Sequence, residues 1–302
     1  MKLQRLRVFS ILPVFLFALY LSLKPHPLVQ PAVQGASQSK QEITCVHQVR
    51  FFEPQLFFEG IKANKSREQA SVLSNIRGGI IPHHLLASQI LAEFFQILGG
   101  QDIETVILLG PNHYETGESK ILTSACAWQS PVGQVEPDIA IIEKLTKNEV
   151  VTPDETVIDN EHSVSGLMPY IATFLPKAKV VPIVLSATLS KEELENLIAN
   201  LALVTNQKTV VVASVDFSHN LDSAHAAAND QLTLRLIKQK NYNELMSLDN
   251  RYLDSPVCIV TLVSLMDSLG ASQSRVLQNT NSGELYNQPN VAGTSYASIL
   301  YY

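Results

Sequence analysis

The segment Thr105–Tyr114 constrains the fold of this 302-residue chain more than any other. Val106–Leu109 is a continuous apolar run, and Gly110 and Pro111 follow it. Such a run is typical of a strand buried on both faces, as in a parallel or mixed sheet covered by helices. The strand then presents His113 at the sheet edge where open α/β folds bind their ligands.

A second segment, Gly78–His84, has the same plan, because an apolar strand ending at Ile81 leads into Pro82 and His83. Between the two strands, Leu85–Leu98 carries apolar residues at helical spacing and stops at two glycines, which predicts a helix. Strand, helix and strand within about 35 residues form a βαβ unit. Two strands that each end in proline and histidine can deliver two imidazoles to one crevice.

The rest of the chain continues the alternation of strands and helices. The predicted strands are Val180–Leu185, Thr209–Ser214, Ser274–Gln278 and Ser295–Leu300. The predicted helices run from Glu136–Asp138 to Leu145 and over Ser163–Leu175, Lys191–Leu203, Ala224–Lys240 and Val257–Leu269. We therefore expect one α/β domain over residues 45–302, with three α/β/α layers around a mostly parallel or mixed central sheet.

Four segments carry more specific expectations. Pro182 lies inside a predicted strand, which indicates an edge position or a bulge. Cys45–Gly60 is predicted to form a hairpin or a covering segment. Lys120–Val135 is predicted to be a looped or short-stranded excursion. Ser190 and Glu193 form a capping box before the helix that starts at Lys191.

The first 23 residues have the pattern of an export signal. Lys2, Arg5 and Arg7 precede the apolar run Val8–Leu23, which is short for a bilayer span. No clear small-residue cleavage site follows, so residues 1–23 are predicted to be a signal peptide or a membrane anchor. Residues 24–44 are rich in Pro, Gln, Ser and Ala and are predicted to be a flexible linker. The remainder is expected to be exported, in contact with the membrane if the segment is uncleaved.

Composition excludes two classes of function. A net charge of −6, without a basic stripe, argues against a nucleic-acid partner. Cys45, Cys126 and Cys258 are widely spaced, so the chain has no CxxC zinc or redox motif, and at most one internal disulfide can form.

Ionisable residues recur where apolar segments end or helices begin. They are His83 and His84, His113, Glu161 and His162, and Asp216 with His219. Histidine, aspartate and glutamate are the residue types used for metal ligation and proton transfer. Each could alone be a capping or structural residue, but unrelated histidines have no reason to recur at one sheet edge. The other histidines, His26, His47 and His225, are predicted to be surface or structural residues.

These motifs together resemble the Memo-like family, whose bacterial and archaeal members are called AmmeMemoRadiSam system protein B. The resemblance runs from about Gly78 to the C-terminus. It rests on Pro82-His83, Gly110-Pro-Asn-His113, Pro131 to Asp138, Glu161-His-Ser163, Ser214-x-Asp-Phe-Ser-His219 and Gly293-Thr-Ser-Tyr296. It implies the fold of class III extradiol dioxygenases, in which a non-haem metal sits at a sheet edge.

The resemblance implies His83 and His113 as the first two metal ligands. The family often has a cysteine as third ligand before an apolar helix, and here the register leaves Asp254 or Cys258 at that position. Two histidines and Asp254 would resemble a non-haem iron site, whereas Cys258 would favour copper or zinc. We expect one divalent or redox metal ion, with iron and Asp254 favoured.

The resemblance further implies a redox enzyme on an unidentified small-molecule substrate, with His162 and His219 as catalytic acid and base and Glu161 and Asp216 orienting them. The alternative is a non-catalytic exported protein that binds or handles metal or interacts with a partner. The chain also departs from the family pattern, since His84, Leu85 and Leu86 replace the usual small residues after Pro82-His83, and Ser165 replaces an acid.

Overall fold

The computed structural model describes residues 45–65 and 74–302, so the predicted signal or anchor over 1–23 and the linker over 24–44 lie outside the described residues. None of the helices within the described ranges combines the length and apolarity that a bilayer crossing requires. The strands are β1 Val46–Gln48, β2 Gly78–Ile81, β3 Thr105–Pro111, β4 Ile121–Thr123, β5 Ala127–Ser130, β6 Gly133–Val135, β7 Thr152–Pro153, β8 Lys179–Leu185, β9 Thr209–Ser214, β10 His219–Leu221, β11 Ser274–Asn281 and β12 Gly293–Tyr301.

Helices alternate with these strands over most of the described chain. They are α1 Pro54–Lys65, α2 Ser88–Leu98, α3 Ile139–Lys147, α4 Glu155–Asn160, α5 His162–Ser165, α6 Met168–Phe174, α7 Lys191–Val204, α8 Ser223–Gln239, α9 Tyr242–Met246, α10 Pro256–Ser268 and α11 Ser282–Leu285, with a 3-10 turn at Leu85–Ala87. The predicted capping box is present at the start of α7: Ser190 accepts from the Glu193 N–H, and the Glu193 side chain accepts from the Ser190 N–H.

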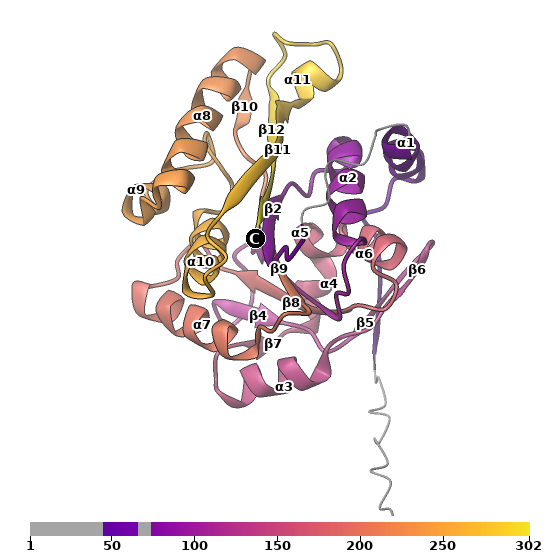
Figure 1. Ribbon diagram of the computed structural model, residues 1–302, viewed down its shortest axis with the longest axis vertical. Helices are drawn as coiled ribbons and strands as arrows, with labels where there is room; N and C mark the ends of the chain where they lie inside the picture. The colour runs from indigo at the N-terminus through magenta and orange to yellow at the C-terminus, as the bar shows by residue number, and fades with distance from the viewer. Residues whose placement is uncertain (1–44, 66–73) are drawn as a thin grey trace, which may run out of the picture. The chain divides into compact units, whose positions relative to one another are not determined.

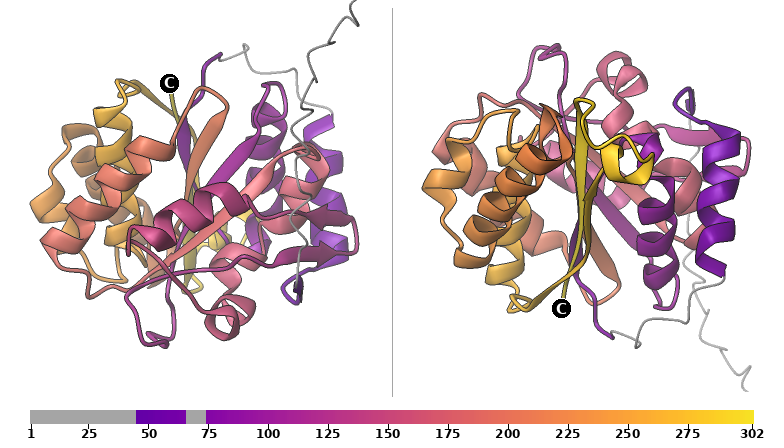
Figure 2. Two further views of the ribbon diagram at one scale, coloured as in Figure 1. Left: turned by 90° about the horizontal axis from the view of Figure 1, so that it is seen from below. Right: turned by 90° about the horizontal axis from the view of Figure 1, so that it is seen from above.

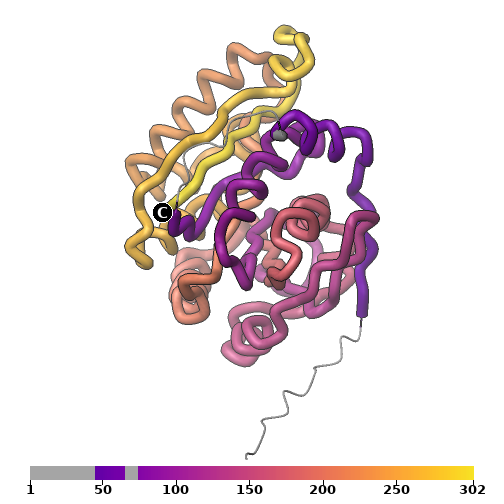
Figure 3. Tube along the Cα trace, turned by 45° about the vertical axis from the view of Figure 1, so that its right-hand side comes forward, coloured from indigo at the N-terminus to yellow at the C-terminus, as the bar shows by residue number. Residues whose placement is uncertain are grey.

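A large mixed sheet forms the centre of the domain, in the order β10-β12-β2-β9-β3-β8-β4-β7, with β11 paired to β12. Strands β2, β9, β3 and β8 are mutually parallel, whereas β12 runs antiparallel to β2 and β4 antiparallel to β8. Figure 3 shows β11 and β12 side by side along the yellow end of the chain. The parallel strands direct all their carboxyl ends to one edge of the sheet.

Helices cover both faces of this sheet, as the sequence predicts. Figures 1 and 2 show α7, α8, α9 and α10 on one side and α1, α2 and α6 on the other. The central strand β3 divides its side chains between two apolar clusters: Ile107 and Leu109 face one cluster, whereas Val106 and Leu108 face the other. All four are fully buried, which explains why β3 is a continuous apolar run rather than an alternating one.

Pro182 does not mark an edge strand, so that part of the prediction is wrong. Strand β8 pairs with β3 on one side and β4 on the other. On the β4 side, the Pro182 carbonyl accepts a hydrogen bond from the Thr123 hydroxyl (2.7 Å), and the ladder with β4 begins only at Ile183. The proline therefore lies where the missing N–H interrupts no ladder bond.

The N-terminal part of the described chain is a strand and a helix rather than a hairpin. Strand β1 pairs in parallel with β5, and β5 pairs with β6 to form a small second sheet. The pairing of Val46 with Ala127 brings Cys45 beside Cys126, and these two cysteines form a disulfide. His47, predicted to be a surface or structural residue, is buried at 6% exposure.

Candidate metal centre

Three neighbouring parallel strands deliver the central polar residues. His83 lies two residues after β2, His113 two residues after β3, and Asp216 two residues after β9. Because β9 lies between β2 and β3 in the sheet, the three strand ends are adjacent. The sheet topology thus brings together side chains that are up to 133 positions apart in sequence, as in the bond from the His83 N–H to the Asp216 carboxylate.

A close approach at Gly110 positions the next two residues of the centre. A Cβ atom on Gly110 would lie 2.4 Å from the Ser163 Oγ, so only glycine fits there. The Ser163 hydroxyl donates to the Pro111 carbonyl (3.1 Å), which holds the start of α5 against the end of β3. Glu161 is the N-cap of that helix and accepts from the Ser163 N–H (2.9 Å), so Glu161 and His162 both face His113.

Three imidazoles meet at this point. The ring centroids of His83 and His113 are 5.0 Å apart, those of His83 and His162 are 5.2 Å apart, and His113 stacks on His162 at 4.1 Å. One ring nitrogen from each lies within 4.8 Å of the others, a spacing that could hold one metal ion. We call His83, His113, His162 and Asp254 the sheet-edge site.

Hydrogen bonds to the Nδ1 atoms orient two of these rings. His113 Nδ1 is 2.8 Å from the Glu161 Oε1, and His83 Nδ1 is 3.3 Å from the Ser214 carbonyl and 3.2 Å from its hydroxyl. A histidine that donates from Nδ1 to an oxygen keeps Nε2 as its free acceptor, which is the arrangement of metal-ligating histidines. Glu161 and Ser214 therefore prepare the two Nε2 atoms for a cation.

Asp254 supplies a carboxylate to the same place. Its Oδ2 lies 3.3 Å from the His83 Nε2 and 3.8 Å from the His113 Nε2. Its Oδ1 is buried and has no hydrogen-bond partner among the described residues. An orphaned buried carboxylate oxygen beside two imidazole acceptors is unfavourable unless a cation or proton joins them. The residues present therefore fit a metal ion.

Cys258 is less suited to the ligand position. It lies in α10 and is fully buried. Among the described residues, two sets at the sheet edge have ligand atoms within 4.8 Å of one another: His83, His113 and His162, and His83, Asp216 and Asp254. Cys258 belongs to neither set. Burial raises the pKa of the Cys258 thiol, which disfavours the thiolate that a metal needs.

Electrostatics separate the two stacked imidazoles. Burial opposes protonation of His113, but the nearby carboxylates of Asp254 and Glu161 outweigh it and raise its pKa to about 10. Burial lowers the pKa of His162, and together with the neighbouring His83 and His113 it brings this pKa to about 4. Burial disfavours the Glu161 carboxylate, yet the hydrogen bond from His113 lowers its pKa to about 2. At neutral pH His162 is therefore uncharged, while His113 and Glu161 form an ion pair.

The predicted orienting roles of the two acids differ from the observed contacts. Asp216 accepts from the N–H groups of His83 (3.0 Å) and His84 (3.4 Å), so it fixes the loop after β2. His219 begins β10, and its Nδ1 is buried with no hydrogen-bond partner among the described residues. Glu161 lies closer to His113 (2.8 Å) than to His162 (3.4 Å).

A cavity of about 270 Å³ adjoins the sheet-edge site, and much of its lining was missed by sequence reasoning. It is lined by Phe51, Glu53, Leu56, His83, His84, Leu85, Leu86 and His162. The ring centroids of Phe51 and His162 are 5.5 Å apart, and the Tyr296 hydroxyl lies 2.6 Å from the His84 Nδ1. Phe51, Glu53 and Leu56 precede the family motifs, so the aromatic pair Phe51-Phe52 was the only sequence signal for this part of the lining.

Comparison with known proteins places the chain in a family. The model of the family "Memo-like protein" matches residues 57–300. A MEMO1 family protein of Pyrobaculum aerophilum is 30% identical over 237 residues, which are 74% of this chain and 83% of the relative. One from Methanosarcina barkeri is 29% identical over 235 residues, or 75% and 86% of the two chains.

The fold has a counterpart among solved structures. An uncharacterized protein of Escherichia coli K12 superposes with a TM-score of 0.51 at 13% identity, covering 74% of this chain and 99% of that chain. At that identity the likeness concerns the fold alone. The family match extends over the sheet-edge site and most of the described domain, and this chain therefore belongs to the Memo-like family.

Proposed function

We propose that this protein binds one metal ion through His83, His113 and Asp254, and that it is a redox enzyme of the dioxygenase type acting on a small molecule. The observation that carries the proposal is the convergence of two histidine Nε2 atoms on the Asp254 Oδ2, at 3.3 and 3.8 Å. Two histidines and one carboxylate are the ligand set of non-haem Fe(II) oxygenases, so iron is favoured over copper or zinc.

The bound metal would bind and polarise the substrate or oxygen. The chain's own residues provide orientation and proton transfer. Glu161 holds the His113 ring, and Ser214 holds the His83 ring. His162 lines the adjoining cavity and is neutral at pH 7, so it can accept a proton from a substrate there. His219 is the second acid-base candidate, with an unpartnered Nδ1.

The cavity defines the kind of substrate that we expect. Its volume of about 270 Å³ suits a small molecule, and Phe51, Leu56, Leu85 and Leu86 give it apolar walls. The imidazoles of His83 and His162 lie at one part of its lining. A compact apolar or aromatic molecule with a polar group directed at the histidines fits this chemistry.

Metal analysis of the untagged protein tests the proposal. We expect about one metal ion per chain after purification with iron supplied under reducing conditions, and near none in His83→Ala or His113→Ala. Asp254→Asn should lose metal, whereas Cys258→Ser should keep it; the reverse result would make Cys258 the third ligand. Wild-type protein that binds no iron, copper or zinc would overturn the metal site.

Oxygen uptake separates an enzyme from a metal carrier. We expect uptake with catechol-like substrates, lost in His162→Gln while the metal content stays unchanged. Loss of metal in His162→Gln would instead make His162 a ligand. Full metal loading without turnover of any such substrate would favour the non-catalytic metal-handling function.

We also propose that the domain acts outside the cytoplasm, delivered by residues 1–23. The Cys45–Cys126 disulfide supports this, because structural disulfides persist in oxidising compartments. A fusion of residues 1–44 to a reporter that is active only after export should be active, and a fusion without residues 1–23 should not. Extraction with alkaline carbonate then distinguishes an uncleaved anchor from a cleaved signal.

A further inference from the structure

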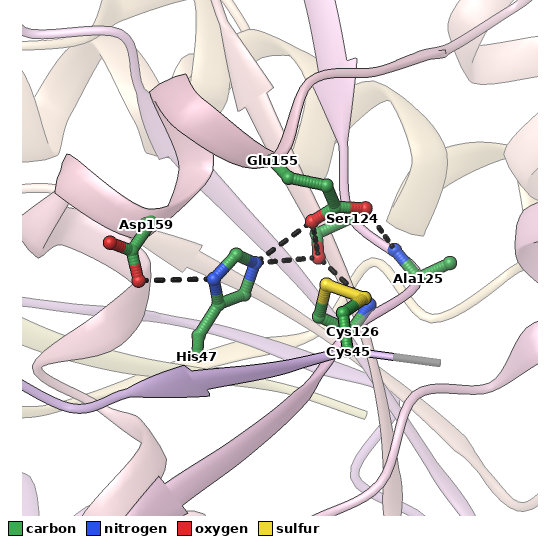
Figure 4. Close-up of a disulfide and its surroundings, with 7 residues drawn as sticks. All are labelled: Cys45, His47, Ser124, Ala125, Cys126, Glu155 and Asp159. Carbon is green, nitrogen blue, oxygen red and sulfur yellow. Dashed lines mark hydrogen bonds and ion pairs between the residues drawn. A yellow bond between two sulfur atoms is a disulfide. The ribbon is translucent and has the colours of Figure 1, made fainter. Parts of the chain in front are cut away.

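A second cluster of metal-binding residue types surrounds the disulfide and shares no residue with the sheet-edge site. Figure 4 shows its members, which we call the disulfide cluster: Cys45, His47, Ser124, Cys126, Glu155 and Asp159. Three segments supply them: the start of β1, the residues just before β5, and α4. Strand β1 pairs with β5, and His47 of β1 contacts Glu155 and Asp159 of α4. The family motifs include none of these residues.

One carboxylate oxygen of the cluster lies close to the two sulfurs. A carboxylate oxygen of Glu155 and the sulfurs of Cys45 and Cys126 all lie within 4.8 Å of one another. Across a tetrahedral zinc ion, sulfur and oxygen ligands are separated by about 3.5–3.8 Å, as its bond lengths require. Once the sulfurs are no longer bonded, small side-chain movements bring the three atoms to that spacing.

His47 fixes the carboxylate. Its Nε2 lies 2.8 Å from the Glu155 Oε2, and its Nδ1 lies 3.0 Å from the Asp159 Oδ1. The Ala125 N–H donates to the other Glu155 oxygen (3.2 Å). Burial disfavours ionisation of Glu155, yet the bonds from His47 and Ser124 keep its pKa below the ordinary value. The carboxylate is therefore ionised and oriented at neutral pH.

A disulfide that served only as a cross-link would need no such surround. Ser124, His47 and Asp159 also follow the order of a catalytic triad, with the Ser124 Oγ 3.0 Å from the His47 Nε2. Ser124 is fully buried, however, and its hydroxyl donates to Glu155, so a substrate cannot reach it as a nucleophile. The cluster fits cation binding better than acyl transfer.

A cation can reach the cluster from solvent. A cavity of about 490 Å³ opens beside it, lined by Val46, His47, Gln48, Arg50, Glu155, Thr156, Asp159 and Asn160. The Glu155 side chain is 40% exposed, whereas that of His47 is 7% exposed. The ligand group thus has an accessible face and a buried support.

We propose that reduction of the Cys45–Cys126 disulfide converts the disulfide cluster into a zinc site, held by both thiolates and Glu155 and supported by His47. A dithiol reductant transfers two electrons and two protons to the S–S bond, which breaks, and the reductant becomes a disulfide. When Zn²⁺ binds, the two thiols release their protons to water and coordinate as thiolates. A disulfide oxidant reverses this step: it takes two electrons from the thiolates and two protons from water and becomes a dithiol, while the S–S bond re-forms and the ion leaves.

Cobalt(II), a spectroscopic substitute for zinc, tests the proposal in the full-length chain. The background is His83→Ala with His113→Ala, which removes the sheet-edge ligands. After reduction with a phosphine we expect a thiolate-to-cobalt charge-transfer band that titrates to about one ion per chain and disappears when Zn²⁺ is added. The oxidised chain should show no band. Because Cys258 is free in both states, a reduction-dependent band reports only on Cys45 and Cys126.

Glu155→Gln supplies the sharper test, because it leaves both cysteines in place. We expect its reduced form to bind cobalt at least about tenfold more weakly, while Glu195→Gln, an exposed acid in α7, binds as the parent does. No band in the reduced parent, or equal affinity in Glu155→Gln, would overturn the proposal.

A folding control tests whether the cobalt band comes from a folded site or from an unfolded chain. If reduction alone unfolds the chain by circular dichroism, cobalt must restore the folded signal in the parent but not in Glu155→Gln. An equally strong band from the reduced chain in concentrated urea would show that the cysteines bind cobalt without a folded site, and the proposal would fail. The sheet-edge proposal is independent of these outcomes.

Discussion

The sheet-edge site and the disulfide cluster use similar side chains but are assembled by different means. At the sheet-edge site, His83 and His113 follow two parallel strands, β2 and β3, that both pair with β9, so the sheet itself brings these two histidines together. At the disulfide cluster, a three-residue strand, β1, must pair with β5 before Cys45 reaches Cys126. The first arrangement is set by the core, whereas the second depends on a covalent bond at the periphery. The two should therefore respond differently to substitution and to reduction.

The largest expected effect is the loss of metal from the sheet-edge site in His113→Ala. Removing His113 leaves Glu161 and Asp254 as buried carboxylates without their cation, and we expect metal content to fall from about one ion per chain to near none. Elemental analysis measures this. His225→Ala, an exposed histidine on α8, is the matched control and should keep its metal. Retention of metal in His113→Ala would break the assignment of this ligand.

The next effect concerns the disulfide. A cross-link between residues 81 positions apart restricts the unfolded chain, and its removal should lower the free energy of unfolding by about 4–5 kcal/mol. Urea denaturation of Cys45→Ser with Cys126→Ser, compared with the oxidised parent, measures the change. We expect the folded double variant to keep iron at the sheet-edge site. Loss of that iron would show that the two regions are coupled.

The comparison also explains which parts of the structure could be predicted from sequence. The apolar run of β3 and the Pro-His motifs placed His83 and His113 at one edge, because a buried strand has a local pattern and the carboxyl ends of parallel strands share one edge of the sheet. The disulfide and its surround could not be found this way. The pairing of Val46 with Ala127 is a long-range choice between short strands, and His47 gave no signal of burial.

Pro182 shows the same limit within the main sheet. Proline favours edge strands because it has no N–H to donate to a neighbouring strand. Pro182 satisfies this requirement although β8 pairs with strands on both sides. Only the tertiary structure shows that the ladder with β4 starts one residue later, at Ile183. Likewise, the third ligand stayed open between Asp254 and Cys258, because a register shift of four residues in the loop before α10 has no local signature.

A smaller effect is expected from Glu161→Gln. Glutamine keeps the shape but removes the charge that orients His113 and raises its pKa. Partners that orient metal-ligating histidines typically contribute about 10–100-fold to affinity, so we expect iron binding to weaken by that factor. Competition with a chelator measures it. Glu155→Gln should leave iron affinity at the sheet-edge site unchanged, and an equal loss in both variants would remove the distinction between the regions.

The smallest effect is a pH dependence that belongs to the sheet-edge site alone. Without metal, His113 has a pKa of about 10, above its ordinary value, so its proton stabilises the folded chain below about pH 6.5, and this stabilisation is lost as pH rises through 10.

A metal ion must displace that proton. Affinity should therefore rise about tenfold per pH unit between pH 7 and 10 and level off above it. His162, with a pKa of about 4, is already neutral throughout this range and adds nothing to the slope. Calorimetric titration in buffers of different protonation enthalpy should detect about one proton released per metal ion at pH 8, and a smaller release in Glu161→Gln, whose His113 keeps Asp254 but loses the Glu161 carboxylate. Release of no proton at pH 8 from the parent would mean that His113 is already neutral in the free site, and the predicted pH dependence would be wrong.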